Sequence, residues 1–400
     1  MLETEAVVPD RSPVPARNFR RQTGILFLGF IATGAATVLL APVLPLLAAR
    51  WNLSDQAAGS LFSCQFLGSM LGTLASGFVA RKIGTSKALS FGYALMAANA
   101  FVMWLAPWPW LTALAFANGI GIGLVIPTTN MVVSDAFPAN RAAALNIVNL
   151  FWSVGAIACP AILAFSARSA RLGWALLALG ALLTLFALLL LRSNLRAAAR
   201  QVESSSTQFS RGSLLVLALL FFLYIGSEAA VAGWLATYAK RTAFSSGIFW
   251  MTAPSFFWAA MMAGRAVASI ILKRVSEYSA LYSGLLLSAT GILALLLGGT
   301  PVAVLGGAAL SGLGMSAVFP IFISDLSRLF GASSTHVSPY MFAMAALGGA
   351  VLPWLVGVIS SHTGKLQAGL VVALVGVIIQ LGLVLTLGSA APDQHVVKSL

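Results

Sequence analysis

Glu228 is the one acidic residue near the middle of a long apolar segment, which runs from 213 to 239. An ionised carboxylate inside a lipid bilayer costs several kcal/mol unless it is paired, hydrated or protonated. A carboxyl group that is readily protonated suits a site that takes up a proton on one side of a membrane and releases it on the other. We therefore predict that Glu228 is a proton-coupling residue. The alternative is a structural ion pair or a hydrogen bond that fixes helix packing.

Aromatic side chains share this segment with Glu228. At the helical repeat, Tyr224, Glu228 and Tyr238 lie within an arc of about 80°, with Trp234 toward its edge. Aromatic faces stack on the C–H face of a pyranose, while nearby polar groups bind its hydroxyls. Tyr224, Trp234 and Tyr238 are therefore candidate substrate contacts. Since Trp234 and Tyr238 lie near one end of the segment, an interfacial aromatic belt is the alternative for these two.

Polar side chains follow one stripe of another apolar segment, 142–167. Asn146, Asn149 and Ser153 are spaced to lie on one helical face, with Trp152 beside them. Amides in this position can bind substrate hydroxyls, or they can join helices at a gain of ~0.6 kcal/mol each. Both interpretations stay open. The same two interpretations apply to three residues of other segments: Asn118, Asn130 and Gln65.

Arg265 is the only basic residue in a predicted membrane segment that does not lie at the segment's end. The helical rise places it roughly 10 Å from the nearer end of its segment and Glu228 roughly 10 Å deeper. Long side chains or water would have to bridge the two, and Asp325, at the end of another segment, is a competing partner. We predict that Arg265 and Asp325 act in gating salt bridges; simple snorkelling of Arg265 to the interface is the alternative.

The composition requires these residues to sit in membrane helices. Of the 400 residues, 59% are hydrophobic and 8% charged, and the mean hydropathy is +0.94, whereas soluble domains have roughly 25% charged residues. Helices satisfy their backbone hydrogen bonds within one segment, as a bilayer demands. We predict an all-α protein with twelve transmembrane segments, each about 20 residues or longer: 23–48, 56–80, 87–107, 109–133, 142–167, 171–192, 213–239, 248–271, 278–298, 301–323, 337–361 and 366–388.

A polar stretch divides these segments into two groups of six. Residues 193–212 include the run Ser204–Ser206 and several charges, and we predict that they form a cytoplasmic linker. The bundles are then 23–192 and 213–388, with cytoplasmic tails at 1–22 and 389–400. Of the 23 Lys and Arg, 16 fall in segments that this arrangement places in the cytoplasm and 6 on the opposite side. The bias follows the positive-inside rule and predicts that both termini are cytoplasmic.

The two groups also resemble each other at a distance of 193 residues. Such internal repeats are typical of transporters that bind their substrate between related halves. The pair Ser134–Asp135 returns as Ser324–Asp325, at a distance of 190. Five other residues, Gly119, Gly121, Pro127, Gly155 and Pro160, recur as Gly312, Gly314, Pro320, Gly348 and Pro353.

The loop Gly77-Phe-Val-Ala-Arg81-Lys82-Ile-Gly84-Thr-Ser-Lys87 resembles the signature of the major facilitator superfamily between its second and third helices. Together with the twelve segments, the linker and the repeat, this resemblance covers the whole chain and implies two pseudo-symmetric six-helix bundles. It also implies a set of gating charges on the cytoplasmic side, for which Arg81, Lys82, Asp135 and Arg141 are the candidates. Arg81 stands where the family has an acid. For Asp135 and Arg141, an ordinary solvated pair is the alternative.

Tyr224-Ile-Gly226-Ser-Glu228, followed by Trp234 and Tyr238, is similar to a pattern in relatives of the fucose:proton symporter. The segments that contain Trp152 and Pro353 are similar to the same group. This resemblance implies a hexose as substrate. The acids that fucose carriers have in their first and fourth helices are absent here, so the coupling site would have to differ.

These features lead to one functional hypothesis with open alternatives. We predict a monomeric secondary transporter in a bacterial cytoplasmic membrane that imports a monosaccharide with a proton by alternating access, sodium being the other coupling ion considered. A proton-driven exporter of drugs or metabolites and a non-transporting membrane sensor are the alternatives. We expect neither an enzyme nor a nucleic-acid partner, because the sequence has no nucleophile triad and no phosphate-binding motif, and its basic residues are scattered. We expect no cofactor and no metal site.

Overall fold

The computed structural model describes residues 16–195, 211–244, 246–272 and 274–389, and this part of the chain consists of helices joined by short turns and loops, with no strand. The predicted linker and both predicted tails lie largely outside these residues, so the predicted domain boundaries stay a prediction. The α-helices are α1 (Ala16–Val38), α2 (Leu40–Trp51), α3 (Asp55–Ile83), α4 (Thr85–Val102), α5 (Trp110–Ala136), α6 (Arg141–Arg168), α7 (Leu172–Leu191), α8 (Arg211–Thr242), α9 (Ala253–Ile271), α10 (Glu277–Leu297), α11 (Pro301–Met315), α12 (Val318–Phe330), α13 (Ser334–Thr363) and α14 (Leu366–Ser389).

The described helices correspond to the twelve predicted segments, because two segments are each built from a pair of helices. α1 and α2 follow each other across a single residue, Leu39, and α11 is separated from α12 only by Ser316 and Ala317. Ten of the twelve segments are long and apolar enough to cross a membrane, and α4 and α9 are the two outside this set. α4 carries Lys87 and Asn99, and α9 carries Arg265. The predicted all-α membrane fold is confirmed.

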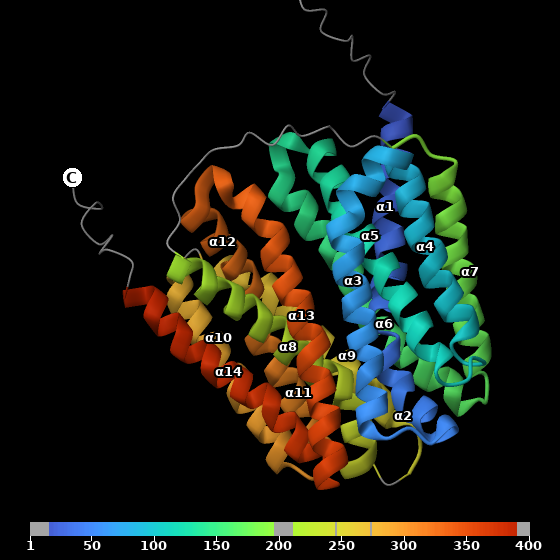
Figure 1. The fold of residues 1–400 in the computed structure, drawn as a ribbon, viewed down its shortest axis with the longest axis vertical. Helices are drawn as coiled ribbons and strands as arrows, with labels where there is room; N and C mark the ends of the chain where they lie inside the picture. Colours follow the sequence, from blue (N-terminus) through green and yellow to red (C-terminus); the bar gives the residue numbers. More distant parts are fainter. Residues whose placement is uncertain (1–15, 196–210, 245, 273, 390–400) are drawn as a thin grey trace, which may run out of the picture.

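The helices form two groups, α1–α7 and α8–α14, which lie on either side of the molecule (Figure 1). We call the end at which α7 stops and α8 starts the linker end. The two groups lie apart at the linker end and come together at the opposite end (Figure 1). The contacts between them involve α3 with α13, α2 with α8, and α6 with α9.

The repeated glycines mark the tightest helix crossings in both halves. A β-carbon on Gly155 of α6 would collide with the Ile31 carbonyl oxygen of α1, and one on Gly348 of α13 would collide with the Phe222 carbonyl oxygen of α8. Small residues let membrane helices approach each other closely. The sequence repeat is therefore also a repeat of helix contacts. A second pair behaves in the same way: Gly119 meets the Gln65 carbonyl and Gly312 meets the Phe257 carbonyl.

We expect Gly155→Ala and Gly348→Ala to destabilise the protein equally, because each added methyl group meets backbone that cannot move alone. Overpacking of this kind costs about 1–3 kcal/mol. The measurement is the unfolding temperature of the purified protein in detergent. Gly306→Ala is the matched control, since a β-carbon on this glycine of α11 has no neighbour within 4 Å. Equal unfolding temperatures for all three variants would show that the crossings tolerate a larger separation.

Candidate functional site

A cavity of about 140 Å³ lies between the two halves at the level of Glu228. One half contributes residues of α1, α2, α3, α5 and α6, and the other contributes residues of α8 and α9. The lining is mainly apolar and aromatic, as in most small-molecule sites. Its polar groups are Thr37, Gln65, Ser69, Trp152 and Glu228. Three predicted site residues, Gln65, Trp152 and Glu228, are thus brought together.

The Glu228 carboxyl group lies beside Tyr224 and forms no direct ion pair in the described part of the chain. Tyr224 lies next to both Glu228 and Arg265, and the charge of Arg265 acts on Glu228. Among the described residues, the ion pairs within 4.0 Å join other residues. The Tyr224 hydroxyl also donates to the Met315 carbonyl oxygen at 3.1 Å. Protonation of Glu228 would therefore change the local charge balance at Arg265 without breaking a direct ion pair.

Gln65 belongs to a small amide network on the other side of the cavity. Its amide nitrogen donates to the Thr37 carbonyl at 3.0 Å, and its amide oxygen accepts from Asn118 at 3.3 Å. Asn118 is 1% exposed and also donates to the Ala36 carbonyl, at 3.3 Å. Asn118 therefore holds Gln65 in place rather than lining the cavity itself. Asn130 is half-buried, and it does not line the cavity either.

Trp152 gives the cavity an unused hydrogen-bond donor. Its indole N–H is buried and has no hydrogen-bond partner among the described residues. Its ring packs edge-on against Trp258 of the other half, with the centroids 5.3 Å apart and the planes at 82°. A buried donor without a partner costs about 1–3 kcal/mol, so an acceptor from a bound solute would be favourable here.

A second cavity of about 270 Å³ lies between α6 and α9. The predicted stripe of Asn146, Asn149 and Ser153 lines one side of it, and Arg265 lines the other. Asn149 donates to the Leu145 carbonyl at 2.8 Å, so one of its two amide hydrogens remains available. Nε of Arg265 is buried without a hydrogen-bond partner in the described part of the chain.

Trp234 and Tyr238 do not reach either cavity, although they share a helix with Glu228. Both side chains are fully buried. The Trp234 indole donates to the Pro353 carbonyl at 2.8 Å, and the Tyr238 hydroxyl donates to the Leu295 carbonyl at 2.9 Å. The structure therefore places both rings in helix packing, where they are neither an interfacial belt nor a cavity wall.

The predicted gating residues other than Arg265 lie at the linker end. Asp325 is 2% exposed and is held by Arg328, three residues further along α12. Arg328 also lies 3.9 Å from Glu277 at the start of α10. Four others, Arg81, Lys82, Asp135 and Arg141, are exposed at the ends of α3, α5 and α6.

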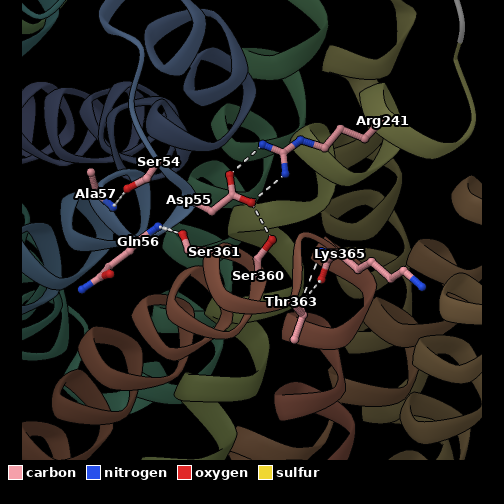
Figure 2. A network of polar contacts seen from close by, with 9 residues as sticks. All are labelled: Ser54, Asp55, Gln56, Ala57, Arg241, Ser360, Ser361, Thr363 and Lys365. Atoms are coloured by element: carbon pink, nitrogen blue, oxygen red, sulfur yellow. Dashed lines mark hydrogen bonds and ion pairs between the residues drawn. The ribbon is translucent and has the colours of Figure 1, made fainter.

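A polar network at the opposite end joins the two halves and was missed by the sequence analysis. Asp55, in the first turn of α3, accepts two hydrogen bonds from Arg241 at the end of α8, at 2.6 and 2.7 Å. Figure 2 shows Asp55 between Arg241 and Ser360, whose hydroxyl also donates to the carboxylate. Ser361 accepts from the Gln56 backbone at 2.9 Å. We call Asp55, Arg241 and Ser360 the latch.

Further contacts join the halves between the latch and the level of Glu228. Ser63 of α3 donates to the Ala350 carbonyl of α13 at 2.7 Å, and Ser255 of α9 donates to the Ile157 carbonyl of α6 at 2.7 Å. The helices also pack closely in this region: a β-carbon on Gly59 of α3 would lie 3.1 Å from the Trp354 α-carbon of α13. The molecule is therefore closed at the opposite end.

Comparison with known proteins agrees with this architecture. The family model described as Major Facilitator Superfamily matches residues 26–338. The glucose/mannose transporter GlcP of Bacillus subtilis is 23% identical over 352 residues, which are 82% of this chain and 85% of that protein. The xylose transporter XylE of E. coli, in an inward open conformation, has a TM-score of 0.74 at 15% identity and covers 91% of this chain and 95% of its own.

The fucose:proton symporter FucP of E. coli has a TM-score of 0.61 at 18% identity, with coverage of 92% of this chain and 99% of its own. At such identities the structural likeness concerns the fold. The chain belongs to the Major Facilitator Superfamily, as the sequence predicted. It is therefore a multi-pass membrane transporter of small molecules and not an enzyme.

We expect Asp55→Asn to increase the fraction of molecules that are open at the opposite end, because it removes the charge that holds Arg241. A partly exposed ion pair contributes up to about 1 kcal/mol, so the shift should reach about fivefold. Spin labels at Ala49→Cys and Lys365→Cys, with Cys64 and Cys159 replaced by serine, report the distance across this end by electron resonance.

The exchanged pair Asp55→Arg with Arg241→Asp should restore the parent distances, and Glu277→Gln, which lies at the linker end, should leave them unchanged. Parent-like distances in Asp55→Asn would mean that the apolar contacts alone keep this end closed.

Proposed function

We propose that the protein imports a monosaccharide together with a proton by alternating access between its two halves. The observation that carries this proposal is the cavity between the halves, in which Glu228 faces the aromatic pair Trp152 and Trp258. In this proposal, the acid that exchanges protons and the aromatic wall that binds the sugar share one compartment, which both halves build. We further propose that the transporter acts as a monomer in a bacterial inner membrane.

The chemistry of the cavity suits a pyranose. Aromatic faces from Trp152, Trp258 and Phe62 can contact the C–H groups of the ring. The unpartnered indole N–H of Trp152 can donate to a hydroxyl oxygen, and the Gln65 amide can serve as donor or acceptor. A few polar groups in an apolar wall set the orientation of a ligand and its specificity.

The position of Glu228 supports the proposed proton coupling. In a water-poor site, the charge of Arg265 stabilises ionised Glu228, and protonation removes that attraction. A proton moved inward with a neutral sugar gains about 2.3 kcal/mol per 100 mV of membrane potential, which is enough to concentrate the sugar.

The observed conformation fits one half of a transport cycle. With the linker end in the cytoplasm, as the distribution of Lys and Arg predicts, closure by the latch makes this the inward-facing state. Support comes from XylE, whose inward open structure shares the fold, and from GlcP and FucP, whose names describe sugar transport. Alternation then requires the latch to open and the linker end to close.

We expect the parent protein in proteoliposomes to accumulate radiolabelled hexose under an inward proton gradient, whereas Glu228→Gln retains exchange but no accumulation. The physical reason is that glutamine binds no proton, so the gradient cannot drive the cycle. Glucose, mannose, galactose and fucose are the substrates to compare.

Glu277→Gln, the replacement of an acid outside both cavities, is the control and should accumulate hexose like the parent. Accumulation by Glu228→Gln would assign this residue a structural role and leave the transporter in place. If no monosaccharide, neutral or acidic, moves under any gradient, the sugar proposal is wrong, and resistance to toxic compounds would then test export.

We expect Trp152→Phe to weaken hexose binding by about three- to tenfold, because it removes the N–H donor and keeps an aromatic ring. Isothermal titration of the detergent-solubilised protein measures the affinity. Trp174→Phe, at a residue that is 73% exposed on the outer surface, should bind like the parent. An unchanged affinity in Trp152→Phe would show that its indole N–H does not contact the sugar.

A further inference from the structure

The cavity between α6 and α9 is lined by a cation and amides, and no carboxylate is among its lining residues. Arg265 faces Asn146, Asn149 and Ser153 across it, with Met262 beside them. Guanidinium and amide N–H groups are the donors that proteins use to bind carboxylates and phosphates. The two cavities thus differ in charge: Arg265 makes this cavity suited to an anion, whereas the cavity at Glu228 contains an acid.

The charge of Arg265 lacks a direct partner in the described part of the structure. Its Nε atom is buried without a hydrogen-bond partner, and its charge acts on Glu228 without an ion pair within 4.0 Å. Asp325, the other acid considered as a partner, is held by Arg328. A half-buried guanidinium that lines a cavity can bind an anion that enters the cavity.

Proton uptake by Glu228 increases the uncompensated positive charge at Arg265. While Glu228 is ionised, Arg265 and Glu228 together carry no net charge; once Glu228 is protonated, the site carries a net charge of plus one. Tyr224, the third titratable group at this position, contributes no negative charge while its hydroxyl donates to the Met315 carbonyl. An anion bound at Arg265 would restore neutrality at the step at which the proton is loaded.

We infer that the transported solute carries a carboxylate, which binds Arg265 with Asn146 and Asn149 in the cavity between α6 and α9, while its hydroxylated ring extends toward Trp152. This inference rests on the proposed proton-coupled sugar transport and names a sugar acid as the substrate class. One proton and one monoanion enter together, so the net charge moved per cycle is zero, whereas a neutral hexose would carry one positive charge inward.

The first test is binding of glucuronate and gluconate, with glucose as the neutral counterpart, by isothermal titration of the detergent-solubilised full chain. We expect the acids to bind more tightly than glucose, and Arg265→Gln to weaken their binding by about 10- to 100-fold with little effect on glucose. Asn149→Ala should weaken acid binding less. The control Arg274→Gln, which changes an exposed arginine beyond the end of α9, should bind like the parent.

The second test is the charge moved by proteoliposomes that contain the parent protein. Glucuronate uptake should respond to a proton gradient and remain insensitive to a potential set with potassium and valinomycin. Two results together would overturn the inference and leave proton-coupled sugar transport standing. They are an inward current during glucose uptake and binding of the two acids that Arg265→Gln does not weaken. Conversely, acid binding that depends on Arg265 but drives no proton-dependent uptake would retain the anion site and refute the proposed symport.

Discussion

A charged group cannot remain in the hydrocarbon core without a counter-charge or water, and this constraint organises the centre of the molecule around Glu228 and Arg265. Tyr224 links the two, and it is held in turn by the Met315 carbonyl and by stacking on Phe319 at 5.6 Å. The Met315 carbonyl lies where α11 stops, just before the break at Ser316 and Ala317. Non-helical backbone at membrane depth is tolerated where protein buries it, so the helix break and the polar relay support each other.

Much of the fold could be predicted because its signals are local. Segments long and apolar enough to cross a membrane are read directly from hydropathy, and the 193-residue repeat records glycines that both halves need at the same crossings, such as Gly155 and Gly348. The site could be predicted only in part. Helical spacing fixes which face of α8 carries Trp234 and Tyr238, but it does not show which neighbour covers that face. The latch was hidden because Asp55 and Arg241 lie 186 positions apart.

At the opposite end, the two halves are joined by an ion pair that water partly reaches. At the latch, the Asp55 side chain is 11% exposed and the Arg241 side chain 45%, so the pair is only partly shielded from water. Pairs of this kind contribute little, about 0.2–1 kcal/mol. Such a weak latch fits the proposed cycle of opening and closing, in which binding of a proton and a solute would have to supply only a small difference between two states. The glycine crossings within each half are tighter and need not change.

Coupling requires that proton and solute each favour the state that the other needs. In the proposed symport of a sugar acid, protonation of Glu228 leaves the positive charge of Arg265 uncompensated, and the carboxylate of the solute takes the place of Glu228 as the counter-charge. Each ligand would then make the binding of the other more favourable, and such coupling is reciprocal. The absence of a direct ion pair between Glu228 and Arg265 leaves more of the five guanidinium N–H donors available to the solute in this scheme.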